Sequence, residues 1–394
     1  MYSLKRELKL NNKERSYLRG IAGFRRFVYN YALDLITASW DFDDIKAGDS
    51  KRLDAIKKVL TSQTMNKPEY AWIRKYPSTV YQSAFQDLKN AFSRWRKGLA
   101  QFPVKKSKKK GDSFTVYKTS GIYLEKGKPA LPFTNRVVIN PGKRITLPGI
   151  KSFRVKEAIN FICSSQTFTV SRTADKWFVS FVLDAQKIPP VIHPIEKIGV
   201  DLGVKTLATC SDGTTYAMPI TTKIAKTKLK LLQWRNRNKV LGNKKLKIRA
   251  SKNAREFYAR TAKIHARLAN IRQDVTQKMT THLSRQAYII RIEDLNVQGM
   301  IANGKLANAV SNNCFYEIRR QLTYKQSFYG TKVELVDRWY PSSKICSHCH
   351  HLQPMTLSQR IFHCQSCGQI QDRDENASVN LENAPNDQVR WASP

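Results

Sequence analysis

The sequence predicts a multidomain α+β protein, with an antiparallel β domain in its first half and an α/β domain in its second half. Three observations predict this fold class. Short alternating strand patterns surround a long helical stretch in the first half, buried strands alternate with helical segments in the second half, and two Cys-x-x-Cys pairs interrupt that second half. The length of 394 residues fits two to three domains.

The first half begins with a weakly alternating segment over 3–10, which predicts one strand. Apolar residues then recur at three- and four-residue spacing from Lys13, again over 51–61, and most regularly from Ser78 to about Lys97. Most of the first hundred residues after the strand are therefore predicted to be helical.

A second β-rich stretch follows over 113–185, where short alternating pieces are separated by proline and glycine. These pieces lie over 113–117, 121–124, 136–139, 144–147, 166–172 and 177–183. The last two flank a turn and predict a β-hairpin. We expect a small antiparallel barrel or sandwich that the segment 3–10 joins as a strand, which would make the helical region an insertion.

The second half is organised around a predicted buried strand over 198–204 that carries one carboxylate, Asp201. A charge in such a strand is costly to bury unless it is paired or holds a metal. A hairpin with an Asp212-Gly213 turn follows. A long helical segment over 222–286 is expected to break at Gly242-Asn243.

Further strands and helices complete the α/β pattern. A β-branched strand over 287–292 ends in Glu293 and Asp294. The periodicity then predicts a helix from about 307 to 329, a strand over 332–336, and a short final helix that starts near Asn376.

The charge balance indicates the partner. Sixty-nine Lys and Arg against 30 Asp and Glu give a net charge of +39. A compact fold with this charge is strongly self-repelling unless a polyanion neutralises it, so nucleic acid is the expected partner and an anionic membrane the alternative. No apolar run reaches the roughly 18 residues of a spanning helix, and the N-terminus lacks the apolar core of a signal peptide. We therefore expect an intracellular, cytoplasmic protein that does not act at a membrane.

Basic residues gather in two segments. The segment 102–111 contains a lysine run, and 19 Lys and Arg stand against two acids between Lys223 and Arg285. Solvated, flexible faces are the alternative, but a backbone-binding surface is favoured in so basic a chain. The candidate nucleic-acid contacts are Lys105, Lys106, Lys108, Lys109, Arg235, Arg237, Lys244, Lys245 and Arg249.

Four of the seven cysteines form two pairs, Cys346 with Cys349 and Cys364 with Cys367, separated by 14 residues. Two such knuckles supply four thiolates in a tetrahedron, which is a closed, structural zinc site, whereas a redox role would need only one pair. Glycine follows the second pair, but His350 stands at the equivalent position of the first. The other three cysteines are expected to be small buried residues.

Three acids form the candidate catalytic site. Asp201 and Glu293 lie on predicted strands and Asp374 at the start of the last helix, where a turn acid or a helix cap is the alternative. Three carboxylates that converge at one sheet edge can hold two divalent cations for phosphodiester hydrolysis. Carboxylates suit magnesium or manganese. Asp294 and Asp372 are the neighbouring competitors.

These motifs resemble a known family. The segments GVDLGVKTLAT, IEDLN, WYPSSKICSHC and DRDENAS are similar to those of RuvC-like nucleases of the TnpB family, which are transposon-encoded RNA-guided DNA endonucleases related to type V CRISPR effectors. FRRFVYNYAL and FPVKKSKKK extend the resemblance more loosely to the first half. The match departs from the family at His350, where glycine is expected, and in the short stretch after the last helix.

The resemblance implies a division into domains and assigns the site residues. It implies a wedge β-barrel domain (1–10 and 112–190), an inserted helical recognition domain with the basic linker (11–111), an RNase H-like RuvC nuclease domain (191–340 and 370–394), and a zinc-ribbon target nucleic-acid-binding domain (341–369). Asp201, Glu293 and Asp374 match the catalytic, magnesium-binding acids, and Cys346, Cys349, Cys364 and Cys367 match the zinc ligands.

The function implied is an RNA-guided DNA endonuclease that uses a transposon-derived guide RNA and cuts double-stranded DNA beside a short adjacent motif. The protein would act as a monomer or as a dimer on one RNA, in a prokaryotic cytoplasm and at the nucleoid when on target. Three alternatives remain: a compact type V CRISPR effector with a CRISPR guide, an RNA-guided DNA-binding protein without nuclease activity, and a guide-independent transposase or resolvase.

Overall fold

The chain folds into two compact units, Met1–Gln186 and Lys187–Pro394. The structure is a computed structural model. It describes residues 2–38, 49–108, 111–117, 137–139, 142–147, 150–159, 163–165, 167–183, 191–239, 242, 248–302, 307, 310, 313–356 and 358–392. The predicted strand 121–124 and the predicted break residue Asn243 lie outside these residues.

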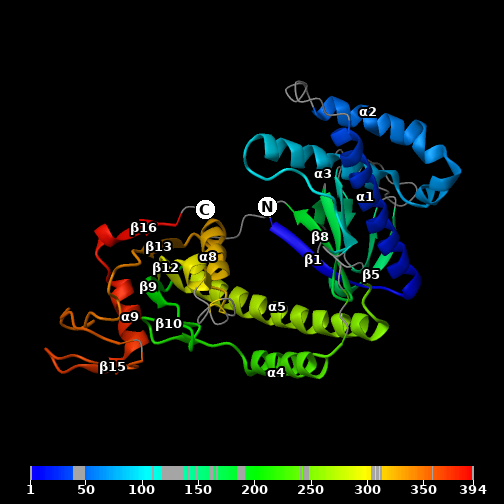
Figure 1. Cartoon of the computed structure of the whole chain (residues 1–394). Helices are drawn as coiled ribbons and strands as arrows, with labels where there is room; N and C mark the ends of the chain where they lie inside the picture. Colours follow the sequence, from blue (N-terminus) through cyan, green and yellow to red (C-terminus); the bar gives the residue numbers. More distant parts are fainter. Residues whose placement is uncertain are drawn as a thin grey trace. The chain divides into compact units, whose positions relative to one another are not determined.

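The first unit is built on a six-stranded antiparallel sheet in the order β2-β7-β8-β1-β5-β4 (Figure 1). β1 lies between β8 and β5, with Leu4 opposite Phe181 and Leu8 opposite Val155. The N-terminal strand therefore joins the sheet, and β7 and β8 form the predicted hairpin. The strands of this unit are β1 (Tyr2–Lys9), β2 (Ser113–Tyr117), β3 (Val137–Ile139), β4 (Gly142–Leu147), β5 (Lys151–Ile159), β6 (Cys163–Ser165), β7 (Thr167–Thr173) and β8 (Lys176–Leu183).

Helices occupy the chain between β1 and β2, where the periodicity predicts them. They are α1 (Asn12–Ala38), α2 (Asp49–Ser62), α3 (Ser78–Arg96) and the 3₁₀ segments η2 (Thr64–Asn66) and η3 (Pro68–Lys75). Asn11 and Glu14 cap the start of α1 reciprocally, each side chain accepting the backbone N–H of the other at 2.8 Å. The apolar faces of α1 and α3 share one hydrophobic core with the sheet, in which Phe24, Phe92 and Phe153 are buried.

The second unit contains a six-stranded mixed sheet in the order β11-β10-β9-β12-β13-β16. β11, β10 and β9 run antiparallel to one another, β12 and β13 run parallel to β9, and β16 is antiparallel at the edge. The strands are β9 (Ile195–Asp201), β10 (Ala208–Cys210), β11 (Thr215–Tyr216), β12 (Ala287–Glu293), β13 (Lys332–Val336) and β16 (Val389–Trp391), with a separate hairpin of β14 (Ile361–His363) and β15 (Ile370–Asp372).

The helices of this unit are α4 (Ile220–Arg235), α5 (Lys252–Gln286), α6 (Val297–Ala302), α8 (Phe315–Tyr329), α9 (Arg373–Glu382) and the 3₁₀ segment η5 (Asn386–Gln388). Gly242, where the break is predicted, has a positive φ of +73°. A methyl group in its place would lie 2.5 Å from the backbone nitrogen of Ala250, so the chain between α4 and α5 closes tightly there. Of the helices described, none has the length and apolar character needed to cross a membrane.

Two predicted elements in this unit differ from their predicted extent. β9 ends at Asp201 rather than at Val204, which is 46% exposed, because the chain turns away at Gly203, where an added Cβ would lie 2.8 Å from the carbonyl oxygen of Thr206. The helix predicted from about 307 to 329 is interrupted: Ala307, Val310 and Asn313 are helical, but Cys314 has a φ of +56° and cannot continue a right-handed helix, so α8 itself begins at Phe315. Asp201 therefore stands at the carboxyl end of its strand.

α9 packs directly on β9 (Figure 1) because of one glycine. A Cβ atom at Gly199 would lie 2.0 Å from the carbonyl oxygen of Ser378 and 2.5 Å from the backbone nitrogen of Glu382. Arg291 on β12 holds the C-terminal end of the helix, donating to the carbonyls of Glu382 at 2.9 Å and Ala384 at 2.7 Å. The helix is thus fixed against the middle of the sheet.

Candidate active site

Asp201 and Glu293 occupy the carboxyl ends of two neighbouring parallel strands. Val200 pairs with Ile292 in the parallel register of β9 and β12, so the next residue on each strand is one of the two acids. Parallel strands bring their carboxyl ends to the same edge of a sheet. The sequence could predict each strand and its acid separately, and the register places the acids side by side.

Asp374 reaches the same edge from the first turn of α9. Asp372 is the N-cap of this helix and accepts the backbone N–H of Asp374 at 2.8 Å, so the turn that carries Asp374 is fixed. One carboxylate oxygen of Asp374 lies 3.9 Å from the position a Cβ would take at Gly203, two residues after Asp201. The guanidinium of Arg373 donates to Asp374 at 2.9 Å.

The electrostatics of the three acids are those of a crowded carboxylate site. Burial, followed by the negative charges of Asp374 and Glu293, raises the pKa of Asp201 to about 7. Burial, followed by the charge of Asp294, raises the pKa of Glu293 to about 7 as well. A carboxylate whose charged form is disfavoured by burial and by neighbouring acids is one that a divalent cation would stabilise, so Asp201 and Glu293, together with Asp374, fit magnesium or manganese chemically.

The neighbouring competitor Asp294 has a different environment. Its buried carboxylate accepts hydrogen bonds from Arg319 at 2.6 Å and Arg338 at 3.0 Å, and also from Arg390. Burial alone would raise the pKa of Asp294, but the hydrogen bond from Arg338 and the charges of Arg319 and Arg390 outweigh it and lower the pKa. Asp294 is therefore saturated by arginines.

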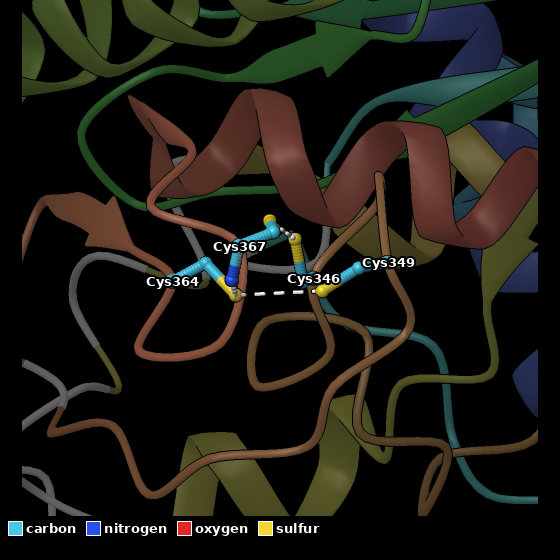
Figure 2. Close-up of side chains that lie close together, drawn as sticks. All are labelled: Cys346, Cys349, Cys364 and Cys367. Carbon is cyan, nitrogen blue, oxygen red and sulfur yellow. Dashed lines mark hydrogen bonds between the residues drawn. The ribbon is translucent and has the colours of Figure 1, made fainter.

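The four predicted zinc ligands converge (Figure 2). The sulfur atoms of Cys346, Cys349, Cys364 and Cys367 all lie within 4.8 Å of one another. The Cys346–Cys367 and Cys349–Cys364 sulfur pairs are 3.7 and 3.5 Å apart. A tetrahedral zinc with bonds of about 2.3 Å has sulfur–sulfur edges of about 3.8 Å, so the cluster fits a structural zinc ion.

The two cysteine knuckles have matching backbones. The backbone N–H of His350 donates to the carbonyl of Cys346 at 2.9 Å, and that of Gly368 donates to Cys364 at 3.1 Å. His350 has a φ of +59° and Gly368 a φ of +75°. The histidine thus adopts the left-handed conformation that the glycine of the second knuckle adopts at no steric cost.

Side chains on α9 anchor the cysteine ribbon to the sheet. Asn376 donates to the carbonyl of Ile345 at 2.7 Å and accepts the backbone N–H of Ser347 at 2.9 Å. Asn380, one turn later, donates to the carbonyls of Ser342 and Ile345, each at 2.7 Å. Both asparagines are buried. One helix therefore carries both Asp374 and the support of the first knuckle.

The basic candidates are in varied surroundings. Lys105 forms an ion pair with Asp34 at 2.7 Å, and the backbone of Lys106 is bound to Asn30. Arg237 lies over the ring of Trp234 at 4.4 Å, and Lys108, Arg235 and Arg249 are exposed. Lys109, Lys244 and Lys245 lie outside the described residues.

Sequence reasoning missed two features beside this site. It did not find the arginines around Asp294, which come from three separate segments, nor the anchoring role of Asn376 and Asn380. The signal for the asparagines was present in the segment 372–380 (DRDENASVN), where Asn376 and Asn380 lie four residues apart on one helical face. No local signal marked the arginines.

Comparison with known proteins identifies the relatives of this chain. A family model described as "Probable transposase" (OrfB_IS605) matches residues 180–304, and a "Cas12f1-like, TNB domain" model matches residues 315–381. A protein of Streptomyces pristinaespiralis is 29% identical over 362 residues, covering 91% of this chain and 83% of the relative. InsQ of Escherichia coli (strain K12) is 28% identical over 397 residues, covering 97% and 91%. Both are named "Putative RNA-guided DNA endonuclease".

These matches support a place for this chain in the TnpB family, related to Cas12f. The TnpB-like protein L79 of Acanthamoeba polyphaga mimivirus is 33% identical over 137 residues, which cover 33% of this chain and 26% of that protein. The fold of this chain resembles that of Cas12f1, solved in complex with sgRNA and target DNA, with a TM-score of 0.52 at 14% identity over 95% of this chain and 83% of that chain. The predicted relation to type V CRISPR effectors is thus confirmed at the level of the fold.

Proposed function

We propose that this protein is an RNA-guided DNA endonuclease that cuts double-stranded target DNA next to a short adjacent motif, using a transposon-derived guide RNA. The names of the two long relatives support the activity. The observation that carries the proposal is the convergence of Asp201, Glu293 and Asp374 at one sheet edge. The sheet supports an RNase H-like nuclease, since three antiparallel strands are followed by two parallel ones.

In this mechanism the protein supplies binding, orientation and charge. Two divalent cations, when bound, activate a water molecule and stabilise the leaving 3′ oxygen. Asp201, on which the charges of both Asp374 and Glu293 act, would hold the cations together with these two acids. Glu293 and Asp374 would each supply a further carboxylate ligand to the cations. Arg373 shields Asp374 when no cation is present, since it donates to that carboxylate at 2.9 Å.

The cysteine ribbon would hold zinc and serve a structural purpose. Its sulfur geometry supports this proposal. The hydrogen bond from Asn376 to the first knuckle would help to fix the position of the helix that carries Asp374. The domain division expected from the resemblance is retained as part of the proposal: a wedge (1–10 and 112–190), a recognition region (11–111), a RuvC-like nuclease (191–340 and 370–394) and a ribbon (341–369). The exposed basic residues Arg235 and Arg249 are proposed backbone contacts, in one protomer or in two on one RNA.

The test replaces Asp201 with alanine in the RNA-loaded protein. We expect RNA and target binding to persist and cutting to fall by at least about a thousandfold, because a cation-binding carboxylate is lost. Glu196→Gln is the matched control, since Glu196 is an exposed acid on the same strand. Cutting that survives in the Asp201 variant would remove the proposed site.

A second candidate is a compact type V CRISPR effector, which the match of 315–381 to a Cas12f1-like domain favours. The chemistry would be the same and only the guide would differ. Sequencing the RNA that copurifies with the full chain separates the two. A transposon-end transcript supports the first candidate, and a CRISPR repeat supports the second.

A further inference from the structure

Three arginines converge on Asp294, the residue directly after Glu293. Arg319 comes from α8, Arg338 from the segment after β13, and Arg390 from β16. We call these three residues the arginine cluster. Arg319 binds one carboxylate oxygen of Asp294, and the other two arginines bind the second oxygen.

The cluster has more positive charge than its acid requires. Three guanidinium groups around one carboxylate leave a net charge of +2. The Asp294 side chain is only 6% exposed, whereas the arginine side chains are 39–63% exposed. Each guanidinium has five N–H donors in a planar fork that matches phosphate geometry. The acid therefore aligns three cationic groups whose outer sides reach solvent.

An exposed tryptophan follows the cluster directly. Trp339 is 84% exposed, although its neighbours on both sides are fixed. Arg338 is bound to Asp294, and Tyr340 packs on the small core of Val336 and Leu381. The carboxylate of Asp337 accepts the backbone N–H of Trp339 at 2.8 Å.

The exposure of this tryptophan is therefore built into a rigid turn. A single exposed apolar residue on a mobile loop would need no explanation. A large aromatic ring held in water beside a cationic cluster is the arrangement that binds single-stranded nucleic acid, where arginines contact phosphates and the ring stacks on a base.

We propose that the arginine cluster and Trp339 form a seat for single-stranded DNA at the entrance to the acids. The inference rests on the proposed nuclease function and names a part of the substrate path. A duplex hides the faces of its bases, so Trp339 can stack only on an unpaired base. Because Asp294 follows Glu293 in the chain, a strand held by the cluster lies beside the catalytic edge. Trp339 thus selects a displaced, unpaired strand, and the arginine cluster holds the phosphates of that strand.

The test uses the full chain with its copurifying RNA and the Asp201→Asn substitution, so that binding is measured without cutting. The probe is an oligothymidylate of about 12 nucleotides that carries one 5-iododeoxyuridine, within the usual site size of such proteins. We expect photocrosslinks, mapped by peptide mass spectrometry, at the peptide that contains Trp339.

The affinity measurements separate stacking from phosphate contact. Trp339→Ala is expected to weaken oligothymidylate binding about tenfold while leaving an abasic oligonucleotide of equal length unaffected. Arg390→Gln is expected to weaken binding of both oligonucleotides by about threefold to tenfold, whereas Arg320→Gln, on an arginine paired with Glu317 on α8, leaves both unchanged.

Three results would overturn the inference. These are crosslinks that map only elsewhere, unchanged binding in Trp339→Ala, or crosslinking at Trp339 by oligouridylate but not by oligothymidylate. A lower melting temperature of Arg390→Gln with unchanged affinity would show that the cluster is only a structural clamp. None of these results depends on cutting, so the inference can fail while the Asp201→Ala test of the nuclease succeeds.

Discussion

The side-chain amide of Asn376 on α9 donates a hydrogen bond to the backbone carbonyl of Ile345, 2.7 Å away and adjacent to the first knuckle cysteine, Cys346. Asn376 lies two residues after Asp374. The same helical turn therefore presents a candidate catalytic acid to the sheet edge and an anchor to the ribbon.

We expect Asn376→Ala to destabilise the zinc-loaded protein by about 1–3 kcal/mol, because it leaves the partly buried carbonyl of Ile345 and the N–H of Ser347 with fewer partners. Zinc release to a chelator should become faster. Asn383→Ala, an exposed asparagine at the end of the same helix, is the control. Equal melting temperatures and release rates for the two variants would contradict the anchoring role.

His350→Gly should stabilise the first knuckle. A non-glycine residue in the left-handed region costs about 1–2 kcal/mol, part of which the greater freedom of glycine in the unfolded chain offsets. We expect a net gain of about 0.5–1 kcal/mol in chemical denaturation of the zinc-loaded protein. The reverse change, Gly368→Ala, should destabilise by a similar amount through strain alone, since no atom lies within 4 Å of the added methyl group. A loss of stability in His350→Gly would show that the imidazole contributes contacts of its own.

Asp201 and Asp294 should respond to neutralisation in opposite directions. Because the pKa of Asp201 is raised in the folded protein, its carboxylate destabilises the fold. This destabilisation is absent at acidic pH, where the group is protonated in both states, and it grows as the pH rises from about 4 to about 7. Asp201→Asn should therefore raise the melting temperature at neutral pH when zinc is retained and magnesium is omitted. Asp294→Asn should lower it, since the lowered pKa of Asp294 reflects an arginine pairing that is lost as pH falls.

Magnesium should bind wild type more tightly as pH increases through 7, and a pH-independent affinity would argue against Asp201 as a ligand.

Lys325 is a buried cation whose three described acceptors are neutral. Its ammonium donates to the carbonyl of Gln277 at 3.1 Å and to the hydroxyls of Thr280 at 2.7 Å and Thr281 at 2.8 Å. Burial lowers the pKa of Lys325 to about 8. Its charge therefore destabilises the fold below pH 8, and this destabilisation decreases as the pH rises from about 8 towards the ordinary lysine pKa. We expect Lys325→Met to raise the free energy of unfolding at pH 7 by about 1–2 kcal/mol. Lys278→Met, at an exposed site on α5, should change it by less than about 0.5 kcal/mol. Destabilisation of the Lys325 variant would show that its hydrogen bonds outweigh its desolvation.

Local patterns predicted much of this protein. The strand that ends in Glu293 and the helix from Ser78 were predictable because each is specified by periodicity within one segment. The convergence of the four cysteines followed from a spacing that only a metal site explains. The left-handed backbone of His350 fits its position as the counterpart of Gly368.

The remainder depends on tertiary structure that no segment encodes. The three-residue strand β16 is too short to show an alternating pattern of apolar and polar residues in the sequence. It nevertheless pairs with β13 and places Arg390 against Asp294. The early end of β9 reflects the tight turn at Gly203, and the late start of α8 reflects the single backbone angle of Cys314. Such features arise from packing between distant parts of the chain.

The glycine at position 199 has a consequence for the tolerance of this fold to change. Where α9 crosses β9, main chain meets main chain, and no side chain between them can adjust its rotamer to absorb an added atom. The distance between the strand that carries Asp201 and the helix that carries Asp374 is therefore set by atomic radii. A methyl group added at position 199 would overlap the backbone of α9 and push the helix away from the strand. This movement would change the spacing between Asp374 and Asp201.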